Sequence, residues 1–254
     1  MHLKVYNAIF YTKLIITSLV FSYDGFDREV FVTKNVELEV KNFAEDFEIP
    51  WGMAFLPDTS MLVTDLSGSL YRVYQDGDKD EIEGMPNVYY KGQGGLLDVE
   101  VHPDFSENNY IYVSYSQPKK GKAFTAVARA KLIRNQLEDF EIIYSTEYKH
   151  YSRKTVHFGS RFAISGDYLF FSIGDRGERD EAQDLDKPNG KIHRLHLDGR
   201  VPSDNPFKLK NGDVSTIWCY GNRNPQGLAF SNEGVLWESE HGPRGGDELN
   251  IIEK

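Results

Sequence analysis

Short apolar segments separated by turn residues recur along most of the chain. Successive residues of Tyr110–Tyr115 alternate between two faces, which is the pattern of a β-strand. Leu169–Ile173 is almost wholly apolar, as expected of a strand buried between two sheets. Turn signals such as Asn189-Gly190 separate these segments, and no stretch shows a sustained helical period. The pattern therefore predicts an all-β protein.

The apolar segments are organised in repeats. Four stretches share one order of a Gly, an apolar pair, a turn, a strand, a second turn and another strand, and they begin at Gly52, Gly94, Gly159 and Gly227. Units of roughly 40–65 residues with several strands each are typical of a β-propeller. A β-sandwich is the competing architecture, but it would not require the same turn chemistry at the same strand junctions. We expect a propeller with about four blades in this chain.

The N-terminus resembles an export signal. Ile9–Ser22 is largely apolar and follows a basic residue, although Lys13 interrupts it and no clear A-x-A cleavage site follows. The run is too short to span a membrane stably. A disordered or weakly amphipathic leader is the alternative. The predicted organisation is a signal peptide, a connector and a propeller domain over residues 1–22, 23–45 and 46–254. The predicted location is periplasmic or secreted.

Composition excludes several functional classes. The 39 Asp and Glu residues outnumber the 29 Lys and Arg residues, and the resulting net charge of −10 argues against nucleic-acid binding. A single cysteine, Cys219, excludes an intramolecular disulfide and a cysteine-rich metal site. Glycine patterns for nucleotides, and the HExxH, GxSxG and CxxC motifs, are absent from the sequence. A redox enzyme with this sequence would need a cofactor other than NAD.

Polar clusters lie next to the predicted strands. Four of them contain glycine, which permits close backbone approach to a ligand: Gly92–Gly95, His157–Arg161, Gly221–Gly227 and Glu240–Glu248. Propellers place functional groups on loops around the central channel, so these clusters are candidates for the site. Asp175–Asp180 mixes charges of both signs, and we expect it to be a solvated loop.

Individual residues in these clusters suggest particular chemistry. His157 is the best candidate for a base, because imidazole titrates near neutrality, although a lone histidine is more often structural. Arg223 and Asn224 have donors suited to an oxygen-rich ligand, or they form a turn in which the arginine pairs with an acid. Asp247 and Glu248, beside Gly-Pro carbonyls, offer oxygen ligands for Ca²⁺, and an acidic turn explains them equally well.

Five motifs, in order, resemble those of the glucose/sorbosone dehydrogenase family: PWGMAFLPD, GQGGLLDVEVHPDF, HFGSRFAI with YLFFSIGDRG, YGNRNPQGLAF and EHGPRGGDELN. Within the family, the chain is most similar to soluble aldose sugar dehydrogenases that use pyrroloquinoline quinone (PQQ). The resemblance runs from about residue 47 to the end. It implies a six-bladed propeller with PQQ on top of the channel, of which this chain has about four blades.

The resemblance also implies roles for single residues. His157 would be the general base that takes the proton of the anomeric hydroxyl while hydride passes to the quinone. Gln93, Arg223 and Asn224 match positions that hydrogen-bond PQQ, and Arg223 would stabilise charge on the reduced cofactor. Calcium is implied at two places, one through the carbonyls of Gly242 and Pro243 and one through Glu248 with Asp247.

The implied activity is oxidation of aldose sugars to lactones, with electrons passed to an acceptor other than oxygen. A sorbosone-type dehydrogenase and a non-catalytic binding module are the alternatives. Members of the family continue for roughly two more blades, so we expect this chain alone to expose a sheet edge, bind PQQ weakly and be poorly active. The sugar and the electron acceptor are the expected partners. The oligomeric state stays open, a homodimer included.

Overall fold

The structure of the protein is a computed structural model that describes residues 29–253, so the predicted signal peptide lies outside the described residues. Contacts divide the chain into two units, one ending at Glu45 and one beginning at Asp46. In the first unit, strands β1 (Glu29–Val32) and β2 (Glu37–Val40) form an antiparallel hairpin. The sequence analysis treated this region as a connector and did not predict the hairpin.

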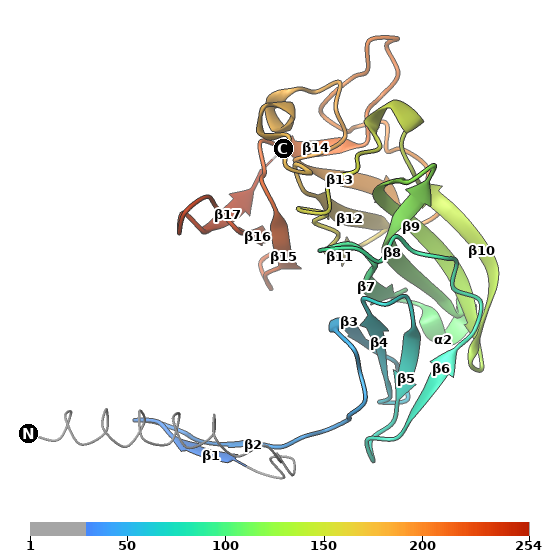
Figure 1. Ribbon diagram of the computed structural model, residues 1–254, viewed down its shortest axis with the longest axis vertical. Helices are drawn as coiled ribbons and strands as arrows, with labels where there is room; N and C mark the ends of the chain where they lie inside the picture. Colours follow the sequence, from blue (N-terminus) through green and yellow to red (C-terminus); the bar gives the residue numbers. More distant parts are fainter. Residues whose placement is uncertain (1–28, 254) are drawn as a thin grey trace, which may run out of the picture. The chain divides into compact units, whose positions relative to one another are not determined.

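The second unit consists of four antiparallel sheets whose strands follow chain order (Figure 1). The first two sheets contain β3 (Pro50–Phe55), β4 (Met61–Asp65), β5 (Leu70–Val73), β6 (Lys79–Ile82), β7 (Leu96–Val101), β8 (Tyr110–Lys119), β9 (Lys122–Ile133) and β10 (Gln136–Tyr144). The other two contain β11 (Phe162–Ser165), β12 (Tyr168–Ile173), β13 (Lys191–His196), β14 (Ile217–Tyr220), β15 (Pro225–Phe230), β16 (Leu236–Glu240) and β17 (Glu248–Ile252). This arrangement confirms the predicted all-β propeller with about four blades.

Helical structure in the described part of the chain is limited to short segments. They are α2 (Phe105–Asn108) and the 3-10 helices η1 (Tyr148–His150) and η2 (Arg179–Gln183). No helix among residues 29–253 has the length and apolar character needed to cross a membrane.

The hydrophobic core lies between neighbouring sheets. On β8, Ile111, Val113 and Tyr115 pack into the cluster shared with the first sheet, whereas Tyr112 packs with Phe171 of the third sheet. The alternation predicted for this strand is therefore confirmed. Because both faces of an inner blade are buried, the middle strands are almost continuously apolar, as predicted for Leu169–Ile173.

Three of the sheets have a fourth, outer strand that the sequence analysis did not predict. The outer strands are β6, β10 and β14. β6 has the sequence Lys-Asp-Glu-Ile, and only its last residue is buried. An outer strand packs little of its surface, so it lacks the apolar signal by which a strand is recognised in the sequence.

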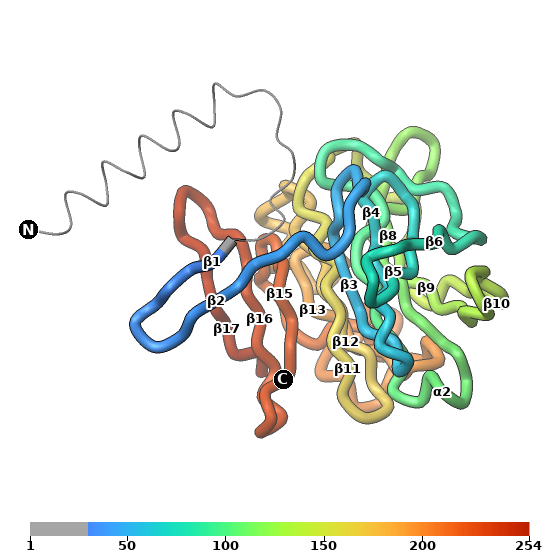
Figure 2. Tube along the Cα trace, turned by 90° about the horizontal axis from the view of Figure 1, so that it is seen from below, coloured from blue at the N-terminus to red at the C-terminus, as the bar shows by residue number. Residues whose placement is uncertain are grey.

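The first strands of the sheets lie side by side at the axis of the propeller. β7 contacts β3 and β11, and β11 contacts β15 (Figure 1). Figure 2 shows β11 and β15 from below. The loops that precede β7, β11 and β15 meet there, where the N–H of Gln93 donates to the carbonyl of Thr155 at 2.8 Å. The end of β12 joins them, since Asp175 N–H donates to the Arg223 carbonyl at 2.7 Å. Segments from three sheets therefore come together at one end of the channel.

Candidate active site

His157 is held in one orientation by two hydrogen bonds. Its Nδ1 lies 2.6 Å from Oδ1 of Asp175, and its backbone N–H donates to Oε1 of Gln93 at 2.6 Å. The residue adopts a φ of 53°, in the left-handed region that non-glycine residues rarely occupy. A Cβ on Gly174 would lie 2.4 Å from the His157 carbonyl oxygen, so only glycine fits where the two segments cross.

Asp175 is the carboxylate that orients this histidine. Burial by itself raises its pKa, but the hydrogen bonds from His157 and from the N–H of Gly177 outweigh burial and hold the pKa below its usual range. Asp175 is therefore ionised near pH 7 and accepts the proton on Nδ1 of His157. In the neutral imidazole this leaves the lone pair on Nε2, the atom that can accept a proton.

The prediction of a solvated loop at Asp175–Asp180 is wrong for its first two residues. Asp175 is 3% exposed and Arg176 is 1% exposed. The guanidinium of Arg176 stacks on the Phe158 ring, 3.3 Å from its centroid, and donates to the carbonyls of Lys154 and Val156. Arg176 thus clamps the segment on both sides of His157. The mixed charges of this segment suggested solvation. Its place directly after the buried strand β12 is the signal that could have indicated that Asp175 and Arg176 are buried.

Gln93 and Asn224 line a cavity of about 220 Å³ next to His157. Its other lining side chains include Trp51, Gln226 and His241. Asn224 Oδ1 accepts from the N–H of Gly159 at 3.4 Å, so its amide group is directed by the loop that carries His157. The structure therefore brings together Gln93, His157 and Asn224, as the motifs predicted.

Arg223 precedes Asn224 and is fixed by the neighbouring strand β16 and by His241, which lines the same cavity. Its backbone N–H and that of Asn224 donate to the carboxylate of Glu240, and its guanidinium donates to the His241 carbonyl at 2.6 Å. Burial raises the pKa of Glu240, while these backbone donors act in the opposite direction. Glu240 thus holds the backbone of Arg223 and does not pair with its guanidinium, which is oriented by the His241 carbonyl.

Arg161 contacts Trp51 and Gln226, which line this cavity, and it links the four sheets. It belongs to the third sheet, and it donates to Oδ1 of Asp98 in the second sheet at 2.9 Å and to the Gln226 carbonyl in the fourth at 2.9 Å. Its guanidinium lies 4.4 Å from the ring of Trp51 in the first sheet. Sequence reasoning placed Arg161 in a candidate cluster but did not predict this role, because its partners are distant in the chain.

The predicted calcium ligands lie in and next to the turn between β16 and β17. The Pro243 carbonyl accepts from the Gly246 N–H at 3.1 Å, and Asp247 Oδ1 accepts from the Gly242 N–H at 3.0 Å. Glu248 is exposed at the start of β17. Among the described residues no three His, Cys, Asp or Glu side chains lie together as a metal site. The predicted set has only two carboxylates, so calcium here stays a prediction.

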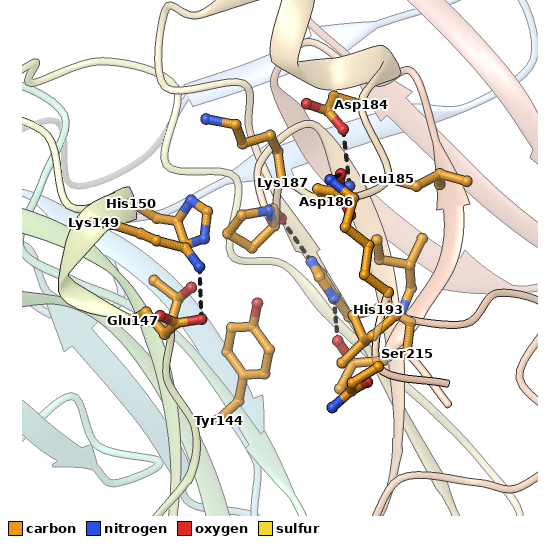
Figure 3. Close-up of a pocket in the computed structure, with 17 residues that line it drawn as sticks. Tyr144, Glu147, Lys149, His150, Asp184, Leu185, Asp186, Lys187, His193 and Ser215 are labelled. Atoms are coloured by element: carbon orange, nitrogen blue, oxygen red, sulfur yellow. Dashed lines mark hydrogen bonds and ion pairs between the residues drawn. The ribbon is translucent and has the colours of Figure 1, made fainter. Parts of the chain in front are cut away.

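A second cavity, of about 710 Å³, lies between the loop after β10 and the loops around β13 (Figure 3). Tyr144 and His193 contribute to its wall, and burial lowers the pKa of His193 to about 3. None of the residues predicted from the motifs lines it. The two cavities are therefore separate, and the smaller one is the candidate active site.

The model of the glucose/sorbosone dehydrogenase family matches residues 47–254, which include every element of the site. The chain belongs to this family. The resemblance of the five motifs is confirmed. The family match covers all four sheets of the propeller.

Relatives of known activity are longer than this chain. It is 42% identical over 229 residues to the aldose sugar dehydrogenase YliI of Escherichia coli, covering 87% of this chain and 60% of the relative. It is 32% identical over 261 residues to quinoprotein glucose dehydrogenase B of Acinetobacter calcoaceticus, covering 91% and 51%. The chain thus spans between half and three-fifths of the length of these two relatives.

Solved structures show the same fold. The soluble aldose sugar dehydrogenase from Escherichia coli in the apo-form superposes with a TM-score of 0.78 at 41% identity, covering 84% of this chain and 62% of that chain. The PQQ-bound form of the aldose sugar dehydrogenase from Streptomyces coelicolor superposes with a TM-score of 0.74 at 28% identity, covering 89% and 64%.

The donors around the smaller cavity suit an anionic, oxygen-rich planar group such as PQQ. Gln93, Asn224 and Gln226 line the cavity, and two cationic groups bond to carbonyls of lining residues, Arg223 to His241 and Arg161 to Gln226. Amide and guanidinium groups bind carboxylate and carbonyl oxygens. The residues present therefore fit the cofactor of the quinoprotein relatives.

Proposed function

We propose that this protein is a PQQ- and Ca²⁺-dependent dehydrogenase that oxidises aldose sugars at the anomeric carbon to lactones and passes the electrons to an acceptor other than oxygen. The hydrogen bond of 2.6 Å between His157 Nδ1 and the buried, ionised Asp175 supports this proposal above all. It gives the chain an oriented base beside a cavity lined with donors. An export signal at the N-terminus and a periplasmic or secreted location are part of the same proposal.

His157 would act as the general base on the sugar. With Nδ1–H donated to Asp175, the Nε2 atom takes the proton of the anomeric hydroxyl, and the carbon–hydrogen bond is broken as hydride leaves. The carboxylate of Asp175 stabilises the imidazolium that forms, so the proton stays on Nε2 until it is passed to water. A positioned general base contributes about 10²–10⁴-fold to a rate.

Gln93, Arg223 and Asn224 would hold and orient the cofactor, which when bound supplies the two-electron acceptor for the hydride. The guanidinium of Arg223 is fixed by the His241 carbonyl, so its positive charge is available where negative charge develops. Trp51 and Phe158 line the cavity and exclude water from one side of it. The protein thus provides orientation, a base and a fixed positive charge.

Calcium would be bound by oxygen atoms at the turn between β16 and β17. We assign the carbonyls of Gly242 and Pro243 to the ion next to the cofactor, and Glu248 with Asp247 to a second ion. Hard oxygen ligands of this kind are those that Ca²⁺ prefers. Isothermal titration of the metal-free chain with CaCl₂ would check this, and Asp247→Asn is expected to lose the binding of the second ion.

The base assignment is tested by replacing His157. In the chain reconstituted with PQQ and Ca²⁺, His157→Ala should reduce sugar-dependent dye reduction at least 10²-fold while the change in visible absorbance on adding PQQ is kept. His102→Ala is the matched control, because His102 follows the opposite end of β7 and the hydrogen bonds of its ring are to its own turn. Full turnover in His157→Ala would refute the base assignment. Absence of any absorbance change with PQQ in a full-length version would favour a non-catalytic binding module.

A further inference from the structure

Two loops next to the candidate active site carry a local excess of positive charge, although the whole chain has a net charge of −10. Residues 117–122 comprise the end of β8, the turn after it and the start of β9, and residues 147–154 follow β10. Together they contain one acid, Glu147, and six basic residues: Lys119, Lys120, Lys122, Lys149, Arg153 and Lys154. We call these six residues the basic rim.

The two loops form one surface because the first lies on the aromatic rings of the second. The ammonium groups of Lys119, Lys120 and Lys122 lie 5.9, 5.6 and 5.1 Å from the ring centroid of Tyr148. Tyr151 also donates a hydrogen bond to Gln117. Each of these cation–π contacts is attractive, so together they hold the lysines near one another despite their mutual repulsion.

Most of the charge on the basic rim is exposed and not neutralised. Lys149 pairs with Glu147 at 2.8 Å, as Figure 3 shows, and Lys154 pairs with Glu178 at 2.8 Å. Within residues 29–253 no carboxylate forms an ion pair with the other four basic residues. Five of the six are exposed, and Lys122 is half-buried.

The basic rim adjoins the site through the chain itself. Lys154 is three residues before His157, and its ammonium donates to the carbonyl of Gly177 at 2.7 Å. The N–H of Gly177 in turn donates to Asp175. A molecule bound on the basic rim would therefore lie beside the loops that carry the proposed base and its carboxylate.

We propose that the basic rim is the docking surface for the electron acceptor, and that this acceptor is a small protein with an acidic face. The inference rests on the proposed function. Each sugar oxidised to a lactone releases two electrons and two protons. Two molecules of a one-electron acceptor take the electrons in turn, and the protons pass to water.

Charge complementarity favours an acidic protein over an anionic membrane as the binding partner of the basic rim. The rest of the chain is more negative than its net charge of −10 and repels an acidic partner, while the basic rim attracts it to the site. Such steering raises association rates by about 10–10³-fold and weakens with salt. An anionic membrane is a wide surface, so it would also face the negative charge around the basic rim and be repelled by it. A small acidic protein can contact the basic rim alone.

Binding can be mapped without any activity. Hexacyanochromate(III), a paramagnetic trianion, should broaden backbone amide resonances of residues 117–122 and 147–154 in the apo chain, and 0.3 M NaCl should remove the effect. Lys119→Glu/Lys120→Glu/Lys122→Glu should abolish the broadening. The control Lys34→Glu/Lys41→Glu/Lys208→Glu changes the charge equally at exposed lysines that are not part of the basic rim, and it should retain the broadening. Broadening that is spread over the surface, or that persists in the basic-rim variant, would overturn the proposal.

Turnover with two acceptors tests the role. With an acidic c-type cytochrome, kcat/KM for the acceptor should fall at least tenfold in the basic-rim variant, whereas with a basic c-type cytochrome it should not fall. Equal kcat/KM for the acidic cytochrome in the wild type and the basic-rim variant would refute the assignment. So would a basic-rim variant that loses binding to anionic phosphatidylserine vesicles but reduces that cytochrome as well as the wild type does. If sugar reduces neither cytochrome nor dye in a version that includes the two further blades, while the anion still maps to the basic rim, the proposed function itself fails.

Discussion

Replacing Arg161 by methionine should destabilise the chain by about 3 kcal/mol near pH 7. Arg161 donates at 2.9 Å to Asp98, a carboxylate that is only 3% exposed and whose other partner is the N–H of Phe162 at 2.8 Å. Removing one partner of a buried pair costs about 3–5 kcal/mol, because a charge is left buried without compensation. The Arg161 side chain is 28% exposed, so we expect the lower end of that range.

The stability lost in Arg161→Met should depend on pH because the carboxyl group of Asp98 titrates. Burial raises the pKa of Asp98 from 3.8 to about 6, although Arg161 and backbone donors act to lower it. A raised folded-state pKa means that ionisation costs the folded state, so this contribution to stability is lost as the pH rises through 6. Without Arg161 the pKa of Asp98 rises further. The loss in Arg161→Met should therefore be larger at pH 7.5 than at pH 5.

Urea unfolding followed by tryptophan fluorescence measures both effects. Arg129→Met, which removes a partly exposed pair between β9 and Glu141 of the outer strand β10, is the control and should cost less than about 1 kcal/mol. The double variant Arg161→Met/Asp98→Asn should be more stable at pH 7.5 than the sum of its single changes predicts, since no buried charge remains. A loss below 1 kcal/mol in Arg161→Met, or an equal loss at pH 5 and pH 7.5, would refute the reasoning.

Three further predictions concern the site and its surroundings. Asp175→Asn should lower sugar-dependent turnover about 10²-fold or more by removing the charge that orients His157, with unchanged PQQ absorbance, and retained turnover would contradict the pairing. Burial raises the pKa of Glu238 from 4.5 to about 7, so its ionisation costs the folded state as pH rises through that range. Glu238→Gln should thus be up to about 3 kcal/mol more stable than wild type in urea at pH 8, with the gain shrinking towards pH 5. Gly174→Ala should cost about 2 kcal/mol or more in thermal unfolding because its Cβ meets the His157 carbonyl, and an unchanged Tm would contradict this crossing.

The strands of the propeller could be predicted only where burial constrains the sequence. β8 and β12 pack between sheets, so their residues had to be alternating or continuously apolar, and both were recognised. The outer strand β6 pairs on one side and is largely solvated, so its composition is compatible with a loop. The hairpin of β1 and β2 was missed for the same reason, since its described side chains are exposed.

By itself the sequence determined the fold class, the number of blades and the family, because these depend on repeated local patterns and on contiguous motifs. It also identified Gln93, His157, Arg223 and Asn224, each of which lies in such a motif. Only the tertiary structure decided which groups act on them. The contact of Asp175 with His157 spans 18 residues, and that of Arg161 with Asp98 spans 63. Mixed charges in a sequence predict solvation, yet folding buries Asp175 and Arg176 because partners from distant segments satisfy them.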